Sequence, residues 1–247
     1  MQLTKDEIQA VNASFESDLA SSFEALKNRL GHLDMEKVLD QIHDFQVAIP
    51  SWALGAGGTR FGRFSFQGEP GTLNQKIDDV GILHALTGSA GAISQHIPWD
   101  IPKDYAAITE RASALGLKFD AMNSNTFQDQ TDATESYKFG SLCALDDKVR
   151  KQAIAHNCEV IDIGKKLGSK SLTVWLADGA SFPGQLNFKR ALDKTMASLK
   201  DIYAHMPDDW KLLIEYKPYE PNFYSTVIQD WGTSFMLANE CGPRAFT

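Results

Sequence analysis

Strand-like and helix-like segments alternate strictly through most of this sequence. From residue 45 onward, each of five short apolar runs precedes a longer segment whose apolar positions have helical spacing. This alternation predicts parallel strands joined by right-handed crossovers. The predicted strands cover 45–52, 92–100, 116–123, 171–179 and 210–217, and the predicted helices lie near 74–87, 103–115, 146–167, 187–206 and 222–240.

The number of strands limits what such a sheet can become. A length of 247 residues suits one (β/α)8 barrel, which has about 250 residues. Closing that barrel needs eight strands with matched tilt and shear, whereas this sequence predicts about five. We therefore expect an α/β fold of the TIM-barrel type, present as an incomplete barrel over residues 45–247. A helical segment is expected over 1–44, with one helix ending near Gly31 and another beginning after the N-cap Asp34.

Charge and composition exclude several classes of partner. The net charge of −8 and the lack of any Lys/Arg run argue against broad electrostatic binding to nucleic acid. No segment approaches the roughly 20 apolar residues of a membrane span, and the N-terminus lacks the apolar core of a secretory signal. The three cysteines form no CxxC pair, so they predict neither a zinc site nor a disulfide framework. We expect a cytoplasmic protein that binds neither nucleic acid nor membrane.

The carboxyl end of each predicted strand carries aromatic or polar side chains. Parallel strands bring these ends to one edge of a sheet, so the residues are expected to lie close together. Aromatic walls with a few directed polar groups suit a small polyol, whose CH faces stack on rings and whose hydroxyls need hydrogen bonds. Taken singly, each could instead be a packing or turn residue. The candidates are Trp52, His96, Phe127, Trp175, Glu215 and Lys217.

The stretch LLIEYKPYEP at 212–221 raises the sharpest functional question. Glu215 and Lys217 are two residues apart on a predicted strand, so both side chains project from the same face. A carboxylate on the inward face of a buried strand is costly unless it is paired or bound to a cation. Two interpretations stay open: a salt bridge between Glu215 and Lys217, or a divalent-metal ligand at Glu215.

Several long motifs occur in a fixed order: PSWALGAGGTRFGRF, HIPWD, GLKFDAMNSNTF, SYKFGSL, GSKSLTVWLADGASFPGQ, PDDWKLLIEYKPYEP and FYSTVIQDWGTS. Together they resemble the bacterial L-rhamnose isomerases of broad aldose–ketose specificity, a branch of the xylose-isomerase-like TIM barrels. The resemblance implies a metal-dependent enzyme with two divalent ions, usually Mn²⁺. Such an enzyme interconverts aldoses and ketoses, such as L-rhamnose and L-rhamnulose, by hydrogen transfer between C1 and C2.

The resemblance implies catalytic roles for three residues. Glu215 matches a ligand of the substrate-binding metal. Lys217 matches a lysine near the C1 oxygen of the sugar, where a cation stabilises developing negative charge. His96 matches a histidine that hydrogen-bonds the substrate.

The resemblance also implies a set of substrate-binding aromatics. Trp52 and Trp175 match walls of the sugar pocket, to which Phe127 adds. Phe61, in GGTRF, matches an aromatic that reaches the active site of a neighbouring subunit. The implied partners are aldose and ketose sugars and further copies of the chain in a homo-oligomer.

The sequence departs from the resembled family in its metal ligands. In the family, an aspartate, a histidine and further ligands follow the fifth unit. Beyond Glu215 this sequence has no His, and its one Asp is Asp230, on the predicted last helix. We therefore expect a truncated part of an isomerase, with little or no isomerase activity by itself.

Other functions are also compatible with these features. A related barrel could be an epimerase, which would use paired carboxylates as acid and base, or a metal-dependent endonuclease, which the net charge of −8 disfavours. A non-enzymatic alternative is a partial barrel that binds sugar weakly or is completed by a partner chain.

Overall fold

A parallel sheet runs through the middle of the chain and confirms the predicted alternation. The computed structural model describes residues 3–55, 67–182, 184–218 and 225–247. The strands of the first sheet are ordered β1-β2-β3 and those of the second β4-β5-β7-β9, and every pairing within them is parallel. A parallel bridge between His96 and Asn123 joins the two. The strands are β1 Ala48–Pro50, β2 Ala92–Ser94, β3 Lys118–Phe119, β4 Met122–Asn123, β5 Ser171–Leu176, β7 Lys211–Tyr216 and β9 Ala245–Phe246.

Several of the predicted strand boundaries were wrong: β1 covers only Ala48–Pro50 of the predicted 45–52, and β5 ends at Leu176 rather than at 179. The strand predicted for 92–100 ends at Ser94, because the N–H of Asp100 donates to the carbonyl of His96 at 2.9 Å and closes a turn. The strand predicted for 116–123 divides into β3 and β4, which lie in different sheets.

The C-terminal region contains strands that the sequence did not predict. β9 pairs with β7 through Leu212↔Ala245 and Leu213↔Phe246, and so forms a further parallel strand beside the fifth predicted one. β6 Gly179–Ala180 and β8 Ser225–Thr226 form an antiparallel pair. The last helix therefore begins at Trp231 rather than near 222, and Asp230 is its N-cap, accepting from the Thr233 N–H at 2.9 Å.

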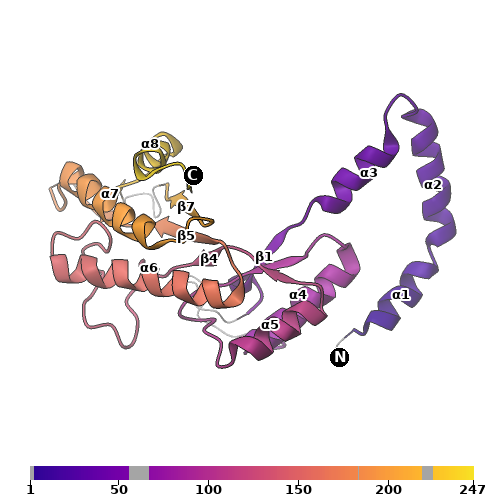
Figure 1. Ribbon diagram of the computed structural model, residues 1–247, viewed down its shortest axis with the longest axis horizontal. Coiled ribbons are helices and arrows are strands. Elements are labelled where there is room, and N and C mark those ends of the chain that lie inside the picture. Colours follow the sequence, from indigo (N-terminus) through magenta and orange to yellow (C-terminus); the bar gives the residue numbers. More distant parts are fainter. Residues whose placement is uncertain (1–2, 56–66, 183, 219–224) are drawn as a thin grey trace.

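Five helices follow the strands and pack along the sheet (Figure 1). Each begins at a side-chain N-cap that accepts a hydrogen bond from the first turn. The alternating strand residues that face these helices are fully buried, as in β5 and β7. The helices are α4 Leu73–Thr87, α5 Tyr105–Ala114, α6 Asp147–Leu167, α7 Phe188–His205 and α8 Trp231–Cys241.

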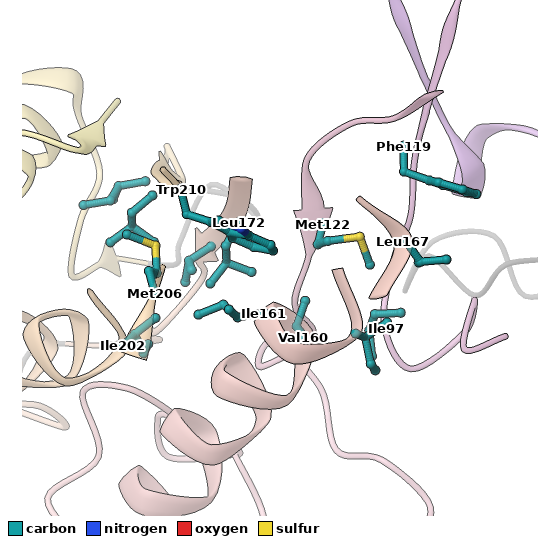
Figure 2. Close-up of a cluster of buried hydrophobic side chains, with 14 of the residues drawn as sticks. Ile97, Phe119, Met122, Val160, Ile161, Leu167, Leu172, Ile202, Met206 and Trp210 are labelled. Carbon is teal, nitrogen blue, oxygen red and sulfur yellow. The ribbon is translucent and has the colours of Figure 1, made fainter. Parts of the chain in front are cut away.

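The hydrophobic core lies between the sheet and α6 and α7. Figure 2 shows Met122 and Leu172, on strands β4 and β5, above Val160 and Ile161 of α6. All four side chains are inaccessible to solvent. Burying a side chain of this size contributes about 1.5–3 kcal/mol, so these contacts hold the strands on their helices.

The N-terminal segment forms an arm of three helices (Figure 1). The helix predicted to end near Gly31 is two helices, α1 Lys5–Ala13 and α2 Glu16–Arg29, while α3 Met35–Asp44 begins at its predicted N-cap Asp34. α1 contacts α4 and buries Ile8. α2 and α3 have no buried residue and extend away from the sheet.

Across the described residues, no helix combines the length and the apolar character that a bilayer crossing requires.

Gly164 tests the contact between α6 and the sheet. A Cβ at this position would lie 2.6 Å from Cγ of Met122 and 2.7 Å from the ring of Trp210. We expect Gly164→Ala to lower the free energy of unfolding by about 1–2 kcal/mol, because overpacking outweighs the gain in helix propensity. Urea denaturation measures this change. Gly31→Ala is the matched control, since its nearest contact would be 3.6 Å; equal effects of the two substitutions would contradict the packing argument.

Candidate functional site

Four of the predicted aromatic residues gather at the carboxyl ends of the strands. Trp52 lies in the short 3-10 helix Ser51–Ala53, directly after β1, and His96 follows β2. Phe127 follows β4, and Trp175 is the fifth residue of β5. Because the strands are parallel, these positions share one edge of the sheet, as the sequence predicted.

The rings form a continuous series of edge-to-face contacts. The ring centroids of Trp52 and His96 are 5.5 Å apart, those of His96 and Phe127 are 5.7 Å apart, and those of Phe127 and Trp175 are 4.9 Å apart. Their interplanar angles of 71–80° are a favourable geometry for aromatic pairs. We call Trp52, His96, Trp99, Phe127 and Trp175 the aromatic wall.

Trp99 belongs to this wall but had no role in the sequence prediction. Its ring stacks on that of His96, with centroids 4.1 Å apart and an interplanar angle of 19°. Its place in HIPWD, three residues after His96, was the available signal. The spacing alone did not reveal that the chain turns back there and stacks the two rings.

His96 sits in the middle of the wall as a buried imidazole. Its Nδ1 has no hydrogen-bond partner among the described residues. Burial lowers the pKa of His96 from 6.5 to about 4; Asp100 opposes that shift, and His156 and Lys76 add to it. His96 is therefore neutral at pH 7 and suited to hydrogen bonding with an uncharged hydroxyl rather than to carrying charge.

Asp100 anchors the turn that carries His96 and Trp99. Its carboxylate accepts hydrogen bonds from the Ser51 hydroxyl, from Nζ of Lys76 at 2.8 Å, and from the backbone N–H of His96 at 2.9 Å. Asp100, Lys76 and Ser51 are all buried. No local pattern predicts this cluster, because its members are up to 49 residues apart.

The pair that the sequence singled out lies at the end of β7. Glu215 is opposite Trp175 in the register of β5 and β7. Although Glu215 is exposed over much of its surface, desolvation of its carboxyl raises its pKa. Lys217 is buried, with its Nζ 5.6 Å from the ring centroid of Trp175.

Glu215 and Lys217 both lie in the part of the chain that the structure describes, and they form no salt bridge with each other. The antiparallel pair β6–β8 instead fixes the backbone at Lys217. The Lys217 N–H donates to the carbonyl of Ile228 at 3.0 Å, and the Thr226 hydroxyl donates to the carbonyl of Lys217 at 2.5 Å. The salt-bridge interpretation of this pair was therefore wrong.

The described residues do not by themselves fit a metal ion. Within 3–55, 67–182, 184–218 and 225–247, no three His, Cys, Asp or Glu side chains gather in a way that could hold one. Asp178, after β5, is already bonded to Ser141 and Cys143. Glu215 is one carboxylate ligand, and a stable site for a hard cation needs several oxygen ligands. Phe61, the predicted contact to a neighbouring subunit, lies outside the described residues.

The chain is similar to two proteins that are named for sugar chemistry. No family model matches it. A protein named probable sugar isomerase, from Rhizobium meliloti (strain 1021), is 48% identical over 248 residues, covering 100% of this chain and 58% of the relative. A second protein so named, from Mesorhizobium japonicum, is 48% identical over 246 residues, covering 99% of this chain and 57% of the relative. The chain thus spans less than two thirds of each relative.

A solved structure confirms the fold class. D-allulose 3-epimerase from Methylomonas sp., in complex with D-allulose, superposes with a TM-score of 0.57 at 14% identity, covering 82% of this chain and 61% of that one. At this identity the likeness concerns the fold alone. The chain has the α/β fold of that TIM-barrel type, as predicted.

The environment of His96 predicts a pH dependence of stability. The unfolded chain takes up a proton near pH 6.5, whereas the folded chain does so only near pH 4. Stability is therefore lost as pH falls between these values, by about 2–3 kcal/mol at most. We expect His96→Gln to lose less unfolding free energy than the unsubstituted protein when urea denaturation is moved from pH 7 to pH 4.5.

The control for this experiment is His32→Gln, which alters an exposed histidine between α2 and α3. It should follow the unsubstituted protein at both pH values. If His96→Gln also kept the full acid dependence, then His96 would not be a buried neutral imidazole.

Proposed function

We propose that this chain forms the sugar-binding part of an aldose–ketose isomerase. The observation that carries the proposal is the aromatic wall at the carboxyl ends of the strands, with Lys217 and Glu215 directly beside Trp175. Such a surface has the apolar faces and the few directed polar groups that a small polyol requires. The two relatives named probable sugar isomerase support the same class of reaction.

Each polar group in the site has a definite role in this proposal. The CH face of the sugar lies against Trp52 and Trp175. Neutral His96 forms a hydrogen bond with a sugar hydroxyl. The ammonium of Lys217 lies near the oxygens at C1 and C2 and stabilises the negative charge that develops there during hydrogen transfer, at a buried position where such stabilisation is strong.

L-rhamnose is the aldose that we propose as substrate, with L-rhamnulose as the product. The support for this choice is the resemblance of motifs such as HIPWD, SYKFGSL and LLIEYKPYEP. Pocket substitutions of one methyl group change such preferences by about 1–3 kcal/mol, so related aldoses belong in the same test.

Manganese and further copies of the chain enter the proposal through the resemblance alone. Glu215 is proposed as one ligand of a divalent ion, and no group of three potential ligands forms among the described residues. The roles of His96 and Lys217 do not depend on that ion. A homo-oligomer is proposed because the family position matched by Phe61 contacts a neighbouring active site.

An epimerase is the competing function within the same fold, as in the D-allulose 3-epimerase structure. Epimerisation by proton transfer uses two carboxylates that flank the reacting carbon. On the face that carries Trp175, β5 and β7 place one carboxylate, Glu215. The buried ammonium of Lys217 beside it favours the isomerase.

A product analysis tests the proposed function. The full-length protein, of which this chain is proposed to be the sugar-binding part, is incubated with L-rhamnose and Mn²⁺ in D₂O. The sugars are followed by NMR. We expect L-rhamnulose to form with little deuterium at C1, because a hydride shift does not exchange with solvent. In a parallel incubation with L-rhamnulose in D₂O, inversion at C3 with deuterium incorporated there would establish the epimerase. The absence of any aldose or ketose conversion would refute both.

Lys217→Met tests the proposed role of the ammonium. We expect kcat for the aldose to fall by about 10²–10³, as for the loss of one oxyanion-stabilising donor, with little change in KM. Steady-state kinetics of the intact protein measures both constants. Lys211→Met, at the exposed start of the same strand, is the control and should retain kcat. An unchanged kcat in Lys217→Met would remove Lys217 from the mechanism.

A further inference from the structure

A buried ion pair lies directly behind the aromatic wall. Asp100 is 1% exposed and Lys76 is 6% exposed, and Nζ of Lys76 lies 2.8 Å from Oδ1 of Asp100. Lys76 comes from the first turn of α4, whereas Asp100 follows β2. Burying two charges is costly unless their remaining hydrogen bonds are satisfied. The burial of this pair therefore indicates a specific structural role.

The second carboxylate oxygen of Asp100 connects two separate parts of the wall. Oδ2 accepts from the Ser51 hydroxyl and, at 2.9 Å, from the backbone N–H of His96. Ser51 immediately precedes Trp52, and Asp100 immediately follows Trp99. One carboxylate thus holds the exits of β1 and β2, which carry three of the five wall residues.

We infer that Asp100, with Lys76 as its counter-charge, is a positioning group that sets the spacing of Trp52, His96 and Trp99 for the sugar. Asp100 and Lys76 are buried, and Asp100 acts through its hydrogen bonds to residues 51 and 96, so both are positioning groups and not catalytic ones. The consequence for sugar binding rests on the proposed function. The consequence for ring geometry does not.

The charge of Lys76 is necessary to this arrangement. Without it, the Asp100 carboxylate would be buried with two neutral donors and no cation, which is strongly unfavourable. Gly55 lies against this lysine, and a Cβ there would lie 2.6 Å from the Pro70 carbonyl and in ordinary contact with Cε of Lys76, at 3.5 Å. The close approach of the Pro70 carbonyl accounts for this glycine.

The pKa of His96 distinguishes a positioning role from a general loss of stability, because Asp100 and Lys76 act on that pKa in opposite directions. The groups that act on His96 are Asp100, which raises its pKa, and His156 and Lys76, which lower it. Asp100→Asn should therefore lower the pKa of His96 further, and Lys76→Met should raise it. Loosened packing alone would move both variants in the same direction, toward the value of an exposed histidine.

The experiment uses the intact protein and L-rhamnose as the probe. Binding is followed by tryptophan fluorescence, ring packing by near-ultraviolet circular dichroism, and His96 by ¹³C NMR titration. We expect at least tenfold weaker binding in Asp100→Asn, and roughly three- to tenfold weaker binding in Ser51→Ala, which loses one hydrogen bond and keeps the ion pair. Both variants should lose aromatic dichroism.

Asp78→Asn is the matched control. Asp78 is also on α4 and pairs with Arg111 of α5, at 2.7 Å from Nε of the guanidinium, on the outside of the fold. This control should bind the sugar as the unsubstituted protein does. Should Asp100→Asn fail to fold, Ser51→Ala and the His96 titration of Lys76→Met decide the matter.

The possible results separate the two proposals. If the unsubstituted protein binds no aldose, the proposed function fails. In that case the dichroism of Ser51→Ala still tests the positioning role, and an unaltered spectrum would overturn it. If the unsubstituted protein binds and Ser51→Ala binds equally well with unchanged dichroism, the positioning role alone is overturned. Shifts of the His96 pKa in the same direction in Asp100→Asn and Lys76→Met would likewise overturn it.

Discussion

The parallel pairing of β5 with β7 is the constraint on which the site depends. Its register runs from Ser171↔Lys211 to Leu176↔Tyr216 and places Trp175 opposite Glu215. Side chains alternate along a strand, so a slip of one residue would turn Glu215 toward the helices and expose Ile214 on the opposite face. The buried residues Leu172, Val174, Leu212 and Ile214 oppose that slip because they pack against the helices. Core packing therefore decides which face carries the functional groups.

The aromatic wall is held at both ends by different forces. Backbone hydrogen bonds of the sheet position Trp175, while the buried carboxylate of Asp100 positions the Trp52 and His96 end. Phe127 joins the two ends, because it contacts His96 at 5.7 Å and Trp175 at 4.9 Å between ring centroids. A rigid surface of this kind suits a sugar, whose weak CH contacts are useful only when the rings are already aligned.

Local signals in the sequence predicted the elements that depend on local physics. The capped helices α5, α6 and α7 and the apolar strands β5 and β7 agree closely with the predicted segments. The strands that were not predicted depend on contacts between residues far apart in the sequence. β9 exists because Ala245 and Phe246 pair with β7, and Ser225–Thr226 forms a strand because it pairs with Gly179–Ala180, where a helix had been predicted.

The same division applies to the candidate site. Trp52, His96, Phe127 and Trp175 could be predicted because parallel strands bring their exits together. The contacts of Asp100 with Lys76 and Ser51 could not, because no periodicity links a helix residue to a turn 24 positions away. The separation of Glu215 from Lys217 also needed the structure, since strand spacing gives a shared face but not a side-chain contact.

A crystal structure of the intact protein with bound L-rhamnose tests the central claim most directly. We expect the sugar to lie against Trp175 and Trp52, with a hydroxyl hydrogen-bonded to His96 and the oxygen at C1 or C2 next to Nζ of Lys217. A sugar bound at another surface, with the aromatic wall in contact with solvent or protein only, would contradict it.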